Sequence, residues 1–288
     1  KFLQKQDVIG SEYDYAALNQ HYAGNPLALQ LAAGVIHDLF GGDIAAFLRT
    51  GEHIFSDIRD LLDEQFERLS PQEKRLLYWL AIGRELVSLD ELITDIRLAS
   101  PVDNVLEVLD FLRRRRSWIE RGEAGQTFTL QPVIMEYVTT RLLEQVYNEL
   151  QTGTFHLLSQ HALMKAQAKD YIRKAQQRLI LKPLLDRMLS IGRKQTEQLL
   201  FQALAILRQK PSQAQGYAAG NILNLLASFA PDLHGRDFSH LTIQHAYLQE
   251  VDLRAVNFTG SGMTASTFTG AFGTILSLAF SQDETRLA

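Results

Sequence analysis

The stretch Val251-Asp252-Leu253-Arg254-Ala255-Val256-Asn257-Phe258-Thr259-Gly260 consists of two five-residue units, each with an apolar residue at its centre. The same spacing continues on both sides of this stretch. An α-helix repeats about every 3.6 residues and a strand about every 2, so neither explains a sustained period of five. A stack of equivalent side chains inside a solenoid does explain it. The central residues in register are Leu233, Phe238, Ile243, Leu248, Leu253, Phe258, Met263 and Phe268.

These residues resemble the pentapeptide-repeat family. In that family four units form one square coil, so the resemblance implies a small β-solenoid of about two coils over residues 230–271. Residues 261–265 are a poor copy of the unit. A second small or apolar residue stands two positions before most of the central residues. That second set is Leu241, Ala246, Val251, Val256, Ser261 and Ser266.

Residues 272–288 follow a different pattern. From Ile275 to Asp283 apolar and polar residues alternate and then reach a turn, which is typical of a strand. The segment resembles the opening of a WD-repeat propeller blade, with Glu284 where such blades commonly have glycine. One partial blade cannot close a propeller, so we expect the rest beyond Ala288.

The first 55 residues are predicted to be helical. Gly24-Asn25-Pro26 interrupts one helix, and a second begins at Pro26, because proline is tolerated in a first turn. Gly41-Gly42 ends that helix, and a short helix follows from Asp43 to Leu48. The expected apolar stripe of the second helix is Leu27, Leu31, Val35 and Leu39.

Residues 56–150 are predicted to form a winged helix-turn-helix. Ser70-Pro71-Gln72-Glu73 fits a capping box, and Ser88-Leu89-Asp90-Glu91 has the same serine-to-glutamate spacing. A third helix follows Asp103, then Trp118-Ile119-Glu120 and Thr127-Phe128-Thr129-Leu130 form a hairpin. A further helix from Val133 to Leu150 closes the unit. The residues expected on the buried side of the third helix are Val105, Leu106, Leu109 and Leu112.

Residues 151–229 are predicted to be a helical linker or small bundle of about four helices, since few helix breakers occur between His156 and Gln209. The fold class is therefore mainly α, with the small solenoid and the start of a blade at the C-terminal end. The core positions expected in the linker are Leu179, Leu184, Leu185, Met188, Leu199, Leu200, Leu204 and Leu207.

Gly24-Asn25-Pro26-Leu27 resembles the GxP motif of NB-ARC and related STAND nucleotide switches. In that family the motif opens a helix beside the nucleotide, its proline packs against adenine, and a winged helix follows. The wing there ends in a histidine-aspartate pair whose histidine touches the β-phosphate of ADP. Here Gln131 and Pro132 occupy those positions. The resemblance, over roughly residues 10–145, implies that Gly24, Pro26, Leu27 and Gln131 contact the nucleotide. Gln131 can donate a hydrogen bond but carries no charge.

Catalysis is not expected in this chain. The phosphate-binding motif G-x-x-x-x-G-K-[ST] is absent, and no lysine directly follows a glycine. The NB-ARC resemblance implies a nucleotide-binding domain upstream of Lys1, so that ADP or ATP would belong to the parent protein without binding this chain tightly. The absence of cysteine excludes thiolate catalysis and disulfides. The most apolar stretch, 26–36, is too short to span a bilayer.

No metal site is predicted either. His234, His240 and His245 lie on the predicted solenoid without the spacing of a ligand set, so they are expected at the surface. The acidic positions of the helix that opens the winged unit are expected to face solvent. They are Asp60, Asp63, Glu64 and Glu67.

The predicted function is that of a non-catalytic regulatory segment in a STAND-type ATP/ADP switch, which couples sensing by C-terminal repeats to the nucleotide state. Its expected partners are the upstream nucleotide-binding domain and a protein or ligand sensed by the repeats, in the cytoplasm and without a membrane. Assembly into an oligomer on activation stays open. One alternative is a protein-interaction scaffold that has lost the nucleotide role.

The second alternative is a DNA-binding regulator. Arg113-Arg114-Arg115-Arg116 ends the third helix of the winged unit, where a recognition helix would meet phosphates. Cations are also common at helix C-termini, and the preceding helix carries Asp103, Glu107 and Asp110, which would repel DNA. DNA is therefore not the expected partner.

Overall fold

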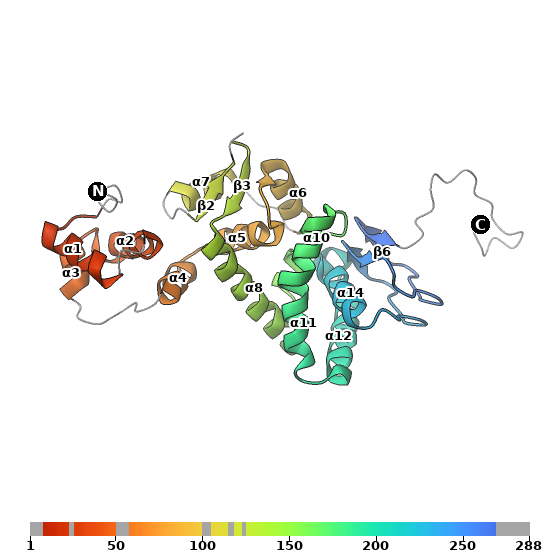
Figure 1. Cartoon of the computed structure of the whole chain (residues 1–288). Coiled ribbons are helices and arrows are strands. Elements are labelled where there is room, and N and C mark those ends of the chain that lie inside the picture. The colour runs from red at the N-terminus through yellow and green to blue at the C-terminus, as the bar shows by residue number, and fades with distance from the viewer. Residues whose placement is uncertain are drawn as a thin grey trace, which may run out of the picture. The chain divides into compact units, whose positions relative to one another are not determined.

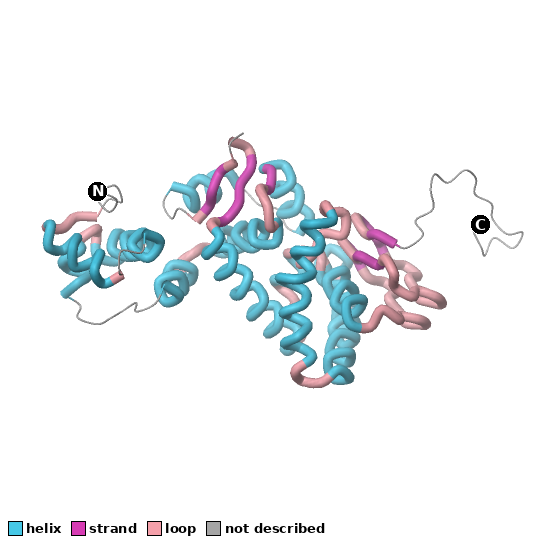
Figure 2. The backbone as a smooth tube through the Cα atoms, in the orientation of Figure 1, coloured by secondary structure: helices cyan, strands magenta, loops and turns pink. Residues whose placement is uncertain are grey.

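The computed structural model describes residues 8–22, 26–49, 58–99, 105–114, 118–122 and 125–268. The chain is mostly helical, with few and short strands (Figures 1 and 2), so the prediction of a mainly α protein is confirmed. It divides into two compact units, Lys1–Val146 and Tyr147–Ala288. The predicted blade over 272–288 lies outside the described residues.

The first unit begins with a small group of helices. The predicted helix from Pro26 is α2, and the turn after it uses Gly41 and Gly42, both with positive φ. Leu39 was expected in the core, but its side chain is 50% exposed, because the apolar stripe of α2 ends before its last turn. The helices of this group are α1 Glu12–His21, α2 Pro26–Phe40, α3 Ile44–Arg49 and α4 Ile58–Glu67.

α4 packs against α2 through one buried amide. Nε2 of Gln65, whose residue is 3% exposed, donates to the carbonyl oxygen of Leu31 at 2.5 Å. Gly34 makes this approach fit, since a Cβ at that position would lie 2.8 Å from the Gln65 amide nitrogen. A polar side chain at this position is satisfied only by the neighbouring helix.

Residues 71–152 contain three helices, a small three-stranded sheet and a long closing helix. Both predicted capping boxes are present, with Ser70 and Ser88 each accepting from the backbone N–H three residues later. The strands pair antiparallel in the order β1-β3-β2, and β1 was not predicted. The elements are α5 Pro71–Gly83, β1 Val87–Ser88, α6 Leu89–Ala99, α7 Val105–Arg114, β2 Ile119–Arg121, β3 Thr127–Leu130 and α8 Pro132–Thr152.

The buried side of α7 is narrower than predicted. Val105, Leu109 and Leu112 are buried, but the side chain of Leu106 is 60% exposed. Residues 105, 109 and 112 share one face at helical spacing, whereas residue 106 lies about 100° further round. α7 therefore presents an apolar residue to solvent, in the neighbourhood of Glu107 and Asp110.

The second unit starts as a helical bundle with more pieces than the four helices predicted. Most predicted core leucines are buried, but Leu179 is 39% exposed, because it lies in a π-helical segment that shifts the helical register. The segments are α9 Leu157–Gln160, α10 Asp170–Gln176, the π-helix Gln177–Leu181, α11 Lys182–Leu189, α12 Arg193–Arg208, α13 Ser212–Gln215 and α14 Ala218–Phe229.

The C-terminal part of this unit is a coil of short parallel pairings between residues twenty positions apart. The strands are β4 Thr242–Gln244, β5 Tyr247–Leu248, β6 Gly262–Thr264 and β7 Thr267–Phe268. β4 pairs with β6 and β5 with β7, and isolated bridges join Asp232 to Asp252 and Asp237 to Asn257. Side chains follow the same offset, since the Asn257 amide donates to Asp237 at 2.9 Å, twenty residues away.

A positive φ recurs at every fifth residue of the coil. The residues are Gly235, His240, His245, Glu250, Ala255, Gly260 and Ala265. This left-handed conformation turns the chain at each corner, so the predicted central residues lie on successive sides of the coil, and those twenty positions apart stack on one another. Leu233, Phe238, Ile243 and Leu248 are buried, whereas the later central residues are half-buried. Phe238 and Phe258, twenty positions apart, form one such stacked pair, with ring centroids 5.7 Å apart.

Helical side chains cover the start of the coil. The Gln215 amide accepts from the backbone N–H of Thr242 at 2.6 Å and donates to the carbonyl oxygen of His240 at 3.4 Å. Asn224 does the same for Tyr247, at 2.8 Å, and His245, at 2.9 Å. Each amide thus supplies the donor and acceptor that a neighbouring strand would otherwise supply.

Candidate functional site

The predicted nucleotide-contacting residues lie at two helix starts of the first unit. Gly24 lies outside the described residues. Pro26 is the first residue of α2 and is exposed, and Leu27 belongs to the same first turn. Gln131 stands between the last residue of β3 and Pro132, the first residue of α8. Two of the predicted positions, Pro26 and Gln131, therefore mark the N-termini of long helices.

Gln131 is held by its backbone. Its N–H donates to the carbonyl oxygen of Trp118 at 3.2 Å, and its own carbonyl oxygen accepts from Met135 at 2.8 Å. The Trp118 ring is 1% exposed and stacks on Phe66, with ring centroids 6.4 Å apart. The backbone of the half-buried Gln131 is thus fixed to the core of this part of the chain through Trp118.

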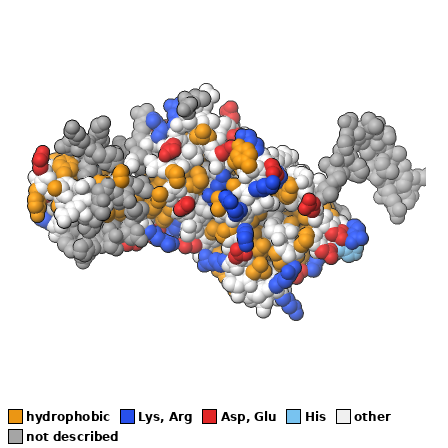
Figure 3. All heavy atoms as spheres, viewed as in Figure 1, with side chains coloured by type: hydrophobic (Ala, Val, Ile, Leu, Met, Phe, Trp, Pro, Cys, Tyr) orange, Lys and Arg blue, Asp and Glu red, His pale blue; other side chains and the backbone are white. Residues whose placement is uncertain are grey.

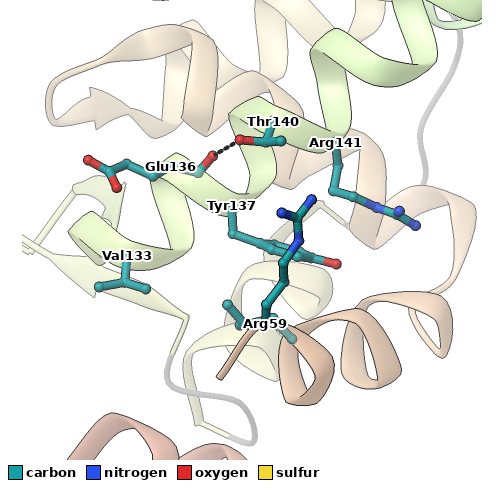
Figure 4. Close-up of a pocket in the computed structure, with 7 residues that line it drawn as sticks. Arg59, Val133, Glu136, Tyr137, Thr140 and Arg141 are labelled. Carbon is teal, nitrogen blue, oxygen red and sulfur yellow. Dashed lines mark hydrogen bonds between the residues drawn. The ribbon is translucent and has the colours of Figure 1, made fainter. Parts of the chain in front are cut away.

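A pocket of about 310 Å³ lies beside the first turns of α8 (Figure 4). α4 and α8 form its walls. Two arginines, one carboxylate, one hydroxyl and one phenol mix with two apolar side chains in its lining. The lining residues are Arg59, Leu62, Val133, Glu136, Tyr137, Thr140 and Arg141. Val133, which lines the pocket, is the second residue of α8, so the pocket lies close in sequence to Gln131, the residue just before this helix.

A polar network joins the two walls of the pocket. The Tyr137 hydroxyl donates to Asp63 at 2.5 Å, and the Arg141 guanidinium pairs with Glu67 and lies 3.9 Å from Asp63. Burial, followed by the hydrogen bond to Asp63, raises the pKa of the Tyr137 phenol above its ordinary value. The phenol therefore stays protonated as a donor. Asp63 and Glu67 are partly exposed, as expected of a helix face that meets solvent, and they also tie α4 to α8.

The aromatic ring of Phe66 packs against the side chains of this network. Phe66 contacts Tyr78 and Tyr137 edge to face, with centroids 5.9 and 5.6 Å apart. The Arg141 guanidinium lies over the Phe66 ring, 5.6 Å from its centroid. A guanidinium over an aromatic face is stabilised by the ring quadrupole and by its carboxylate partners together.

Charge in the pocket is nearly balanced. Arg59 lies 3.6 Å from Glu144, and Arg141 lies 3.8 Å from the same carboxylate. The lining holds neither histidine nor cysteine. The arrangement can therefore hold a polar group by hydrogen bonds, with apolar contact from Leu62 and Val133, but it presents no nucleophile with an adjacent base.

The histidines of the coil do not behave alike. His234 and His240 are exposed, as predicted. His245 was expected at the surface, but its ring is half-buried against Tyr217, because the covering helix α14 reaches that corner of the coil. Among the described residues, no group of three or more His, Asp or Glu side chains is arranged to hold a metal ion.

No helix in the described part of the chain combines the length and the apolar character that crossing a bilayer requires. Arg113, the first of the four arginines, pairs with Asp110 at 3.1 Å. The side chains of the other three lie outside the described residues.

A curated relative covers almost the whole chain. The chain is 41% identical over 312 residues to an uncharacterized WD repeat-containing protein of Nostoc sp. (strain PCC 7120 / SAG 25.82 / UTEX 2576), and the match covers 95% of this chain. The chain spans 25% of that relative's length. No model of a known protein family matches it, and no solved structure matches it.

Proposed function

We propose that the chain is a non-catalytic regulatory segment of a larger STAND-type protein, in which the winged fold responds to ADP or ATP held by a preceding domain. The observation that carries the proposal is that Pro26 and Gln131 both stand at N-termini of long helices in one unit. Helix N-termini favour phosphate, because their first N–H groups are unpaired and the helix dipole is positive there. An exposed proline and a side-chain amide suit an adenine face and a phosphate oxygen, respectively.

The internal bonds of the unit offer a route for coupling. α2 is tied to α4 through Gln65, and α4 is tied to α8 through Asp63 and Tyr137. A domain that binds nucleotide and contacts the starts of α2 and α8 would act on one connected body. The nucleotide state then biases the position of the winged fold by its differential contacts in the two states.

The second unit would carry the sensing part. Its coil, with pairings twenty residues apart and a left-handed corner every fifth residue, has the features expected of a pentapeptide-repeat solenoid. The relative's printed name includes WD repeats, which agrees with a propeller following the coil. Such repeats commonly bind proteins, and the sensed partner is then a protein or a ligand held there.

The test uses ADP and the full-length protein. Gln131→Ala removes the proposed donor to the phosphate and should weaken ADP binding about tenfold in calorimetric titration, since a hydrogen bond to a charged group contributes about 1.5–3 kcal/mol. Gln72→Ala, which removes an exposed glutamine in the first turn of α5, is the matched control and should leave the affinity unchanged. The 288-residue chain alone should show no tight ADP binding. Equal affinities for all three full-length proteins would refute the Gln131 contact.

A protein-interaction scaffold is the second candidate, favoured by the WD repeats in the relative's printed name. A full-length protein that neither retains nor binds nucleotide, yet captures a partner through its C-terminal repeats, would support the scaffold over the switch. Salt-sensitive binding of duplex DNA by the winged fold would support neither, and would favour a DNA-binding regulator.

A further inference from the structure

One segment of the second unit is strongly basic. Between Lys165 and Lys194 the sequence holds nine lysines and arginines and two aspartates, whereas the whole chain has a net charge of −4. Positive charge is therefore concentrated on a short part of a protein that is otherwise acidic. Figure 3 shows blue Lys and Arg side chains, mixed with orange hydrophobic ones, on the visible face of this unit.

Five of the nine cations lie along one continuous helical run. α10, the π-helix and α11 are continuous, because the residues at both junctions, Gln177 and Leu181, keep right-handed helical backbone angles. The exposed residues on its outer side lie three or four positions apart, except for the adjacent pair Arg178 and Leu179. We call this set the basic stripe, and it comprises Tyr171, Lys174, Arg178, Leu179 and Lys182. The exposed fractions of Tyr171 and Leu179 are 59% and 39%, so the stripe combines cations with apolar surface.

Arg178 is the cation of the stripe whose charge is not offset. Lys174 pairs with Asp170 at 2.7 Å, and Lys182 pairs with Asp186 at 3.2 Å. Within the described residues Arg178 makes no ion pair. Arg178 stands between Lys174 and Lys182 on the stripe, next to the exposed Leu179, and Arg and Tyr are residue types enriched at protein interfaces.

The outer side of α7 has complementary chemistry. We call the residues Leu106, Glu107, Asp110 and Phe111 the acidic face. Leu106 and Phe111 are 60% and 39% exposed, and both carboxylates are exposed between them. Asp110 pairs with Arg113, whereas Glu107 makes no ion pair among the described residues.

We propose that the acidic face of one copy docks on the basic stripe of a second copy, with Glu107 of one chain pairing with Arg178 of the other. Both faces repeat at helical spacing, so two helices laid along each other bring charged and apolar positions into register together. The contact joins different surfaces of the two copies, so it is heterologous and can extend to further copies.

A nucleic acid is a poorer occupant of the stripe. The carboxylates of Asp170 and Asp186 lie on the same helical run and are 61% and 59% exposed, so they would face the phosphates. A helix of another protein chain, with charges of both signs and apolar side chains of its own, can contact both the charged and the apolar groups of the stripe.

Sedimentation equilibrium of the 288-residue chain at low salt tests the contact. The chain should self-associate weakly, and Arg178→Glu or Glu107→Arg should each raise the dissociation constant at least tenfold, because like charges then meet. Two measurements isolate the pairing. Mixing the two single variants in equal amounts should restore association, and the variant with both substitutions should associate like the unmodified chain.

The matched control is Lys194→Glu, which makes the same charge change at an exposed cation on α12, outside the stripe. It should associate like the unmodified chain. A chain that stays monomeric at all concentrations refutes the proposal, and so does a mixture of the single variants that fails to associate. If association recovers in the variant with both substitutions but not in the mixture, residues 107 and 178 contact each other within one chain and not between two copies. Tight binding of a duplex DNA probe that Arg178→Glu abolishes, without any self-association, would assign the stripe to nucleic acid.

Discussion

At the scale of single residues, His245 stands out because a titratable ring is enclosed where the coil meets the helices. Its ring stacks on the fully buried Tyr217 ring, with centroids 5.9 Å apart and planes 25° apart. Its Nδ1 is buried and has no hydrogen-bond partner among the described residues. Burial first, and then the charge of Lys165, lowers the pKa of His245 to about 4. The ring is therefore neutral at physiological pH.

The lowered pKa predicts a loss of stability in mild acid. The unfolded chain, with a histidine pKa near 6.5, takes up the proton before the folded chain does. The stability due to the neutral ring is thus fully present above pH 6.5 and is lost as the pH falls towards 4. Because the ring is partly exposed, we expect a loss of about 2 kcal/mol, measured by urea unfolding across this range.

His245→Phe is the control for this prediction. Phenylalanine keeps a ring against Tyr217 but cannot be protonated, so the free energy of unfolding should fall less between pH 6.5 and 4 than in the unmodified chain. Identical pH profiles for the two proteins would show that His245 does not contribute.

At the scale of elements, the first turn of the coil depends on helical side chains. The exposed edge of a short strand leaves N–H and C=O groups without partners, and here Gln215 and Asn224 provide them from α13 and α14. The close approach of α14 depends on Gly220, because a Cβ there would lie 1.8 Å from the carbonyl oxygen of Gln244. The coil is therefore packed directly on the helix backbone.

Asn224→Ala should destabilise the second unit by about 2–3 kcal/mol, because it leaves a donor and an acceptor of the coil unpaired. Thermal unfolding followed by circular dichroism measures this. Asn224→Asp keeps the acceptor for Tyr247 and loses the donor to His245, so it separates the two bonds. Gln202→Ala removes an exposed amide of α12 and should change the midpoint little. A loss as small as that of the Gln202 variant would contradict the covering role of Asn224.

The corners of the coil give a prediction of opposite sign. Ala255 has φ +56° and an exposed position, and a left-handed conformation is unfavourable for any residue with a Cβ. Ala255→Gly should therefore stabilise the coil by about 0.5–1 kcal/mol in urea unfolding. Ala246→Gly, at a buried position without positive φ, should destabilise it. Equal effects of the two substitutions would count against the corner geometry.

At the scale of the whole molecule, charge is distributed unevenly along the chain. The basic segment 165–194 belongs to the second unit, and the acidic face of α7 belongs to the first. Association between copies through these surfaces should weaken as salt rises, because exposed charges are screened over about 8 Å at physiological ionic strength. Hydrophobic contact through Leu106 and Leu179 should persist in part, so salt reduces the association without abolishing all of it.

The local elements followed from the sequence because their signals are local. Capping at Ser70 and Ser88, the end of α2 at Gly41, and the five-residue spacing all depend on a residue and its near neighbours. The errors came at Leu39, Leu106 and Leu179, where an apolar residue near the edge of a helical stripe is exposed. Whether such a residue is buried depends on whether an element distant in sequence packs against it.

The same division applies to the candidate site. The sequence by itself determined that Pro26 and Gln131 mark helix starts and that five-residue units occupy the C-terminal part. Helix breakers and periodicity can be recognised from residues that are neighbours in sequence. Only the tertiary structure decided that Asp63 accepts a hydrogen bond from Tyr137, that Asn224 covers the coil edge, and that β1 pairs with β3. These contacts link residues far apart in the chain, and a side chain finds such a partner only once both backbones are in place.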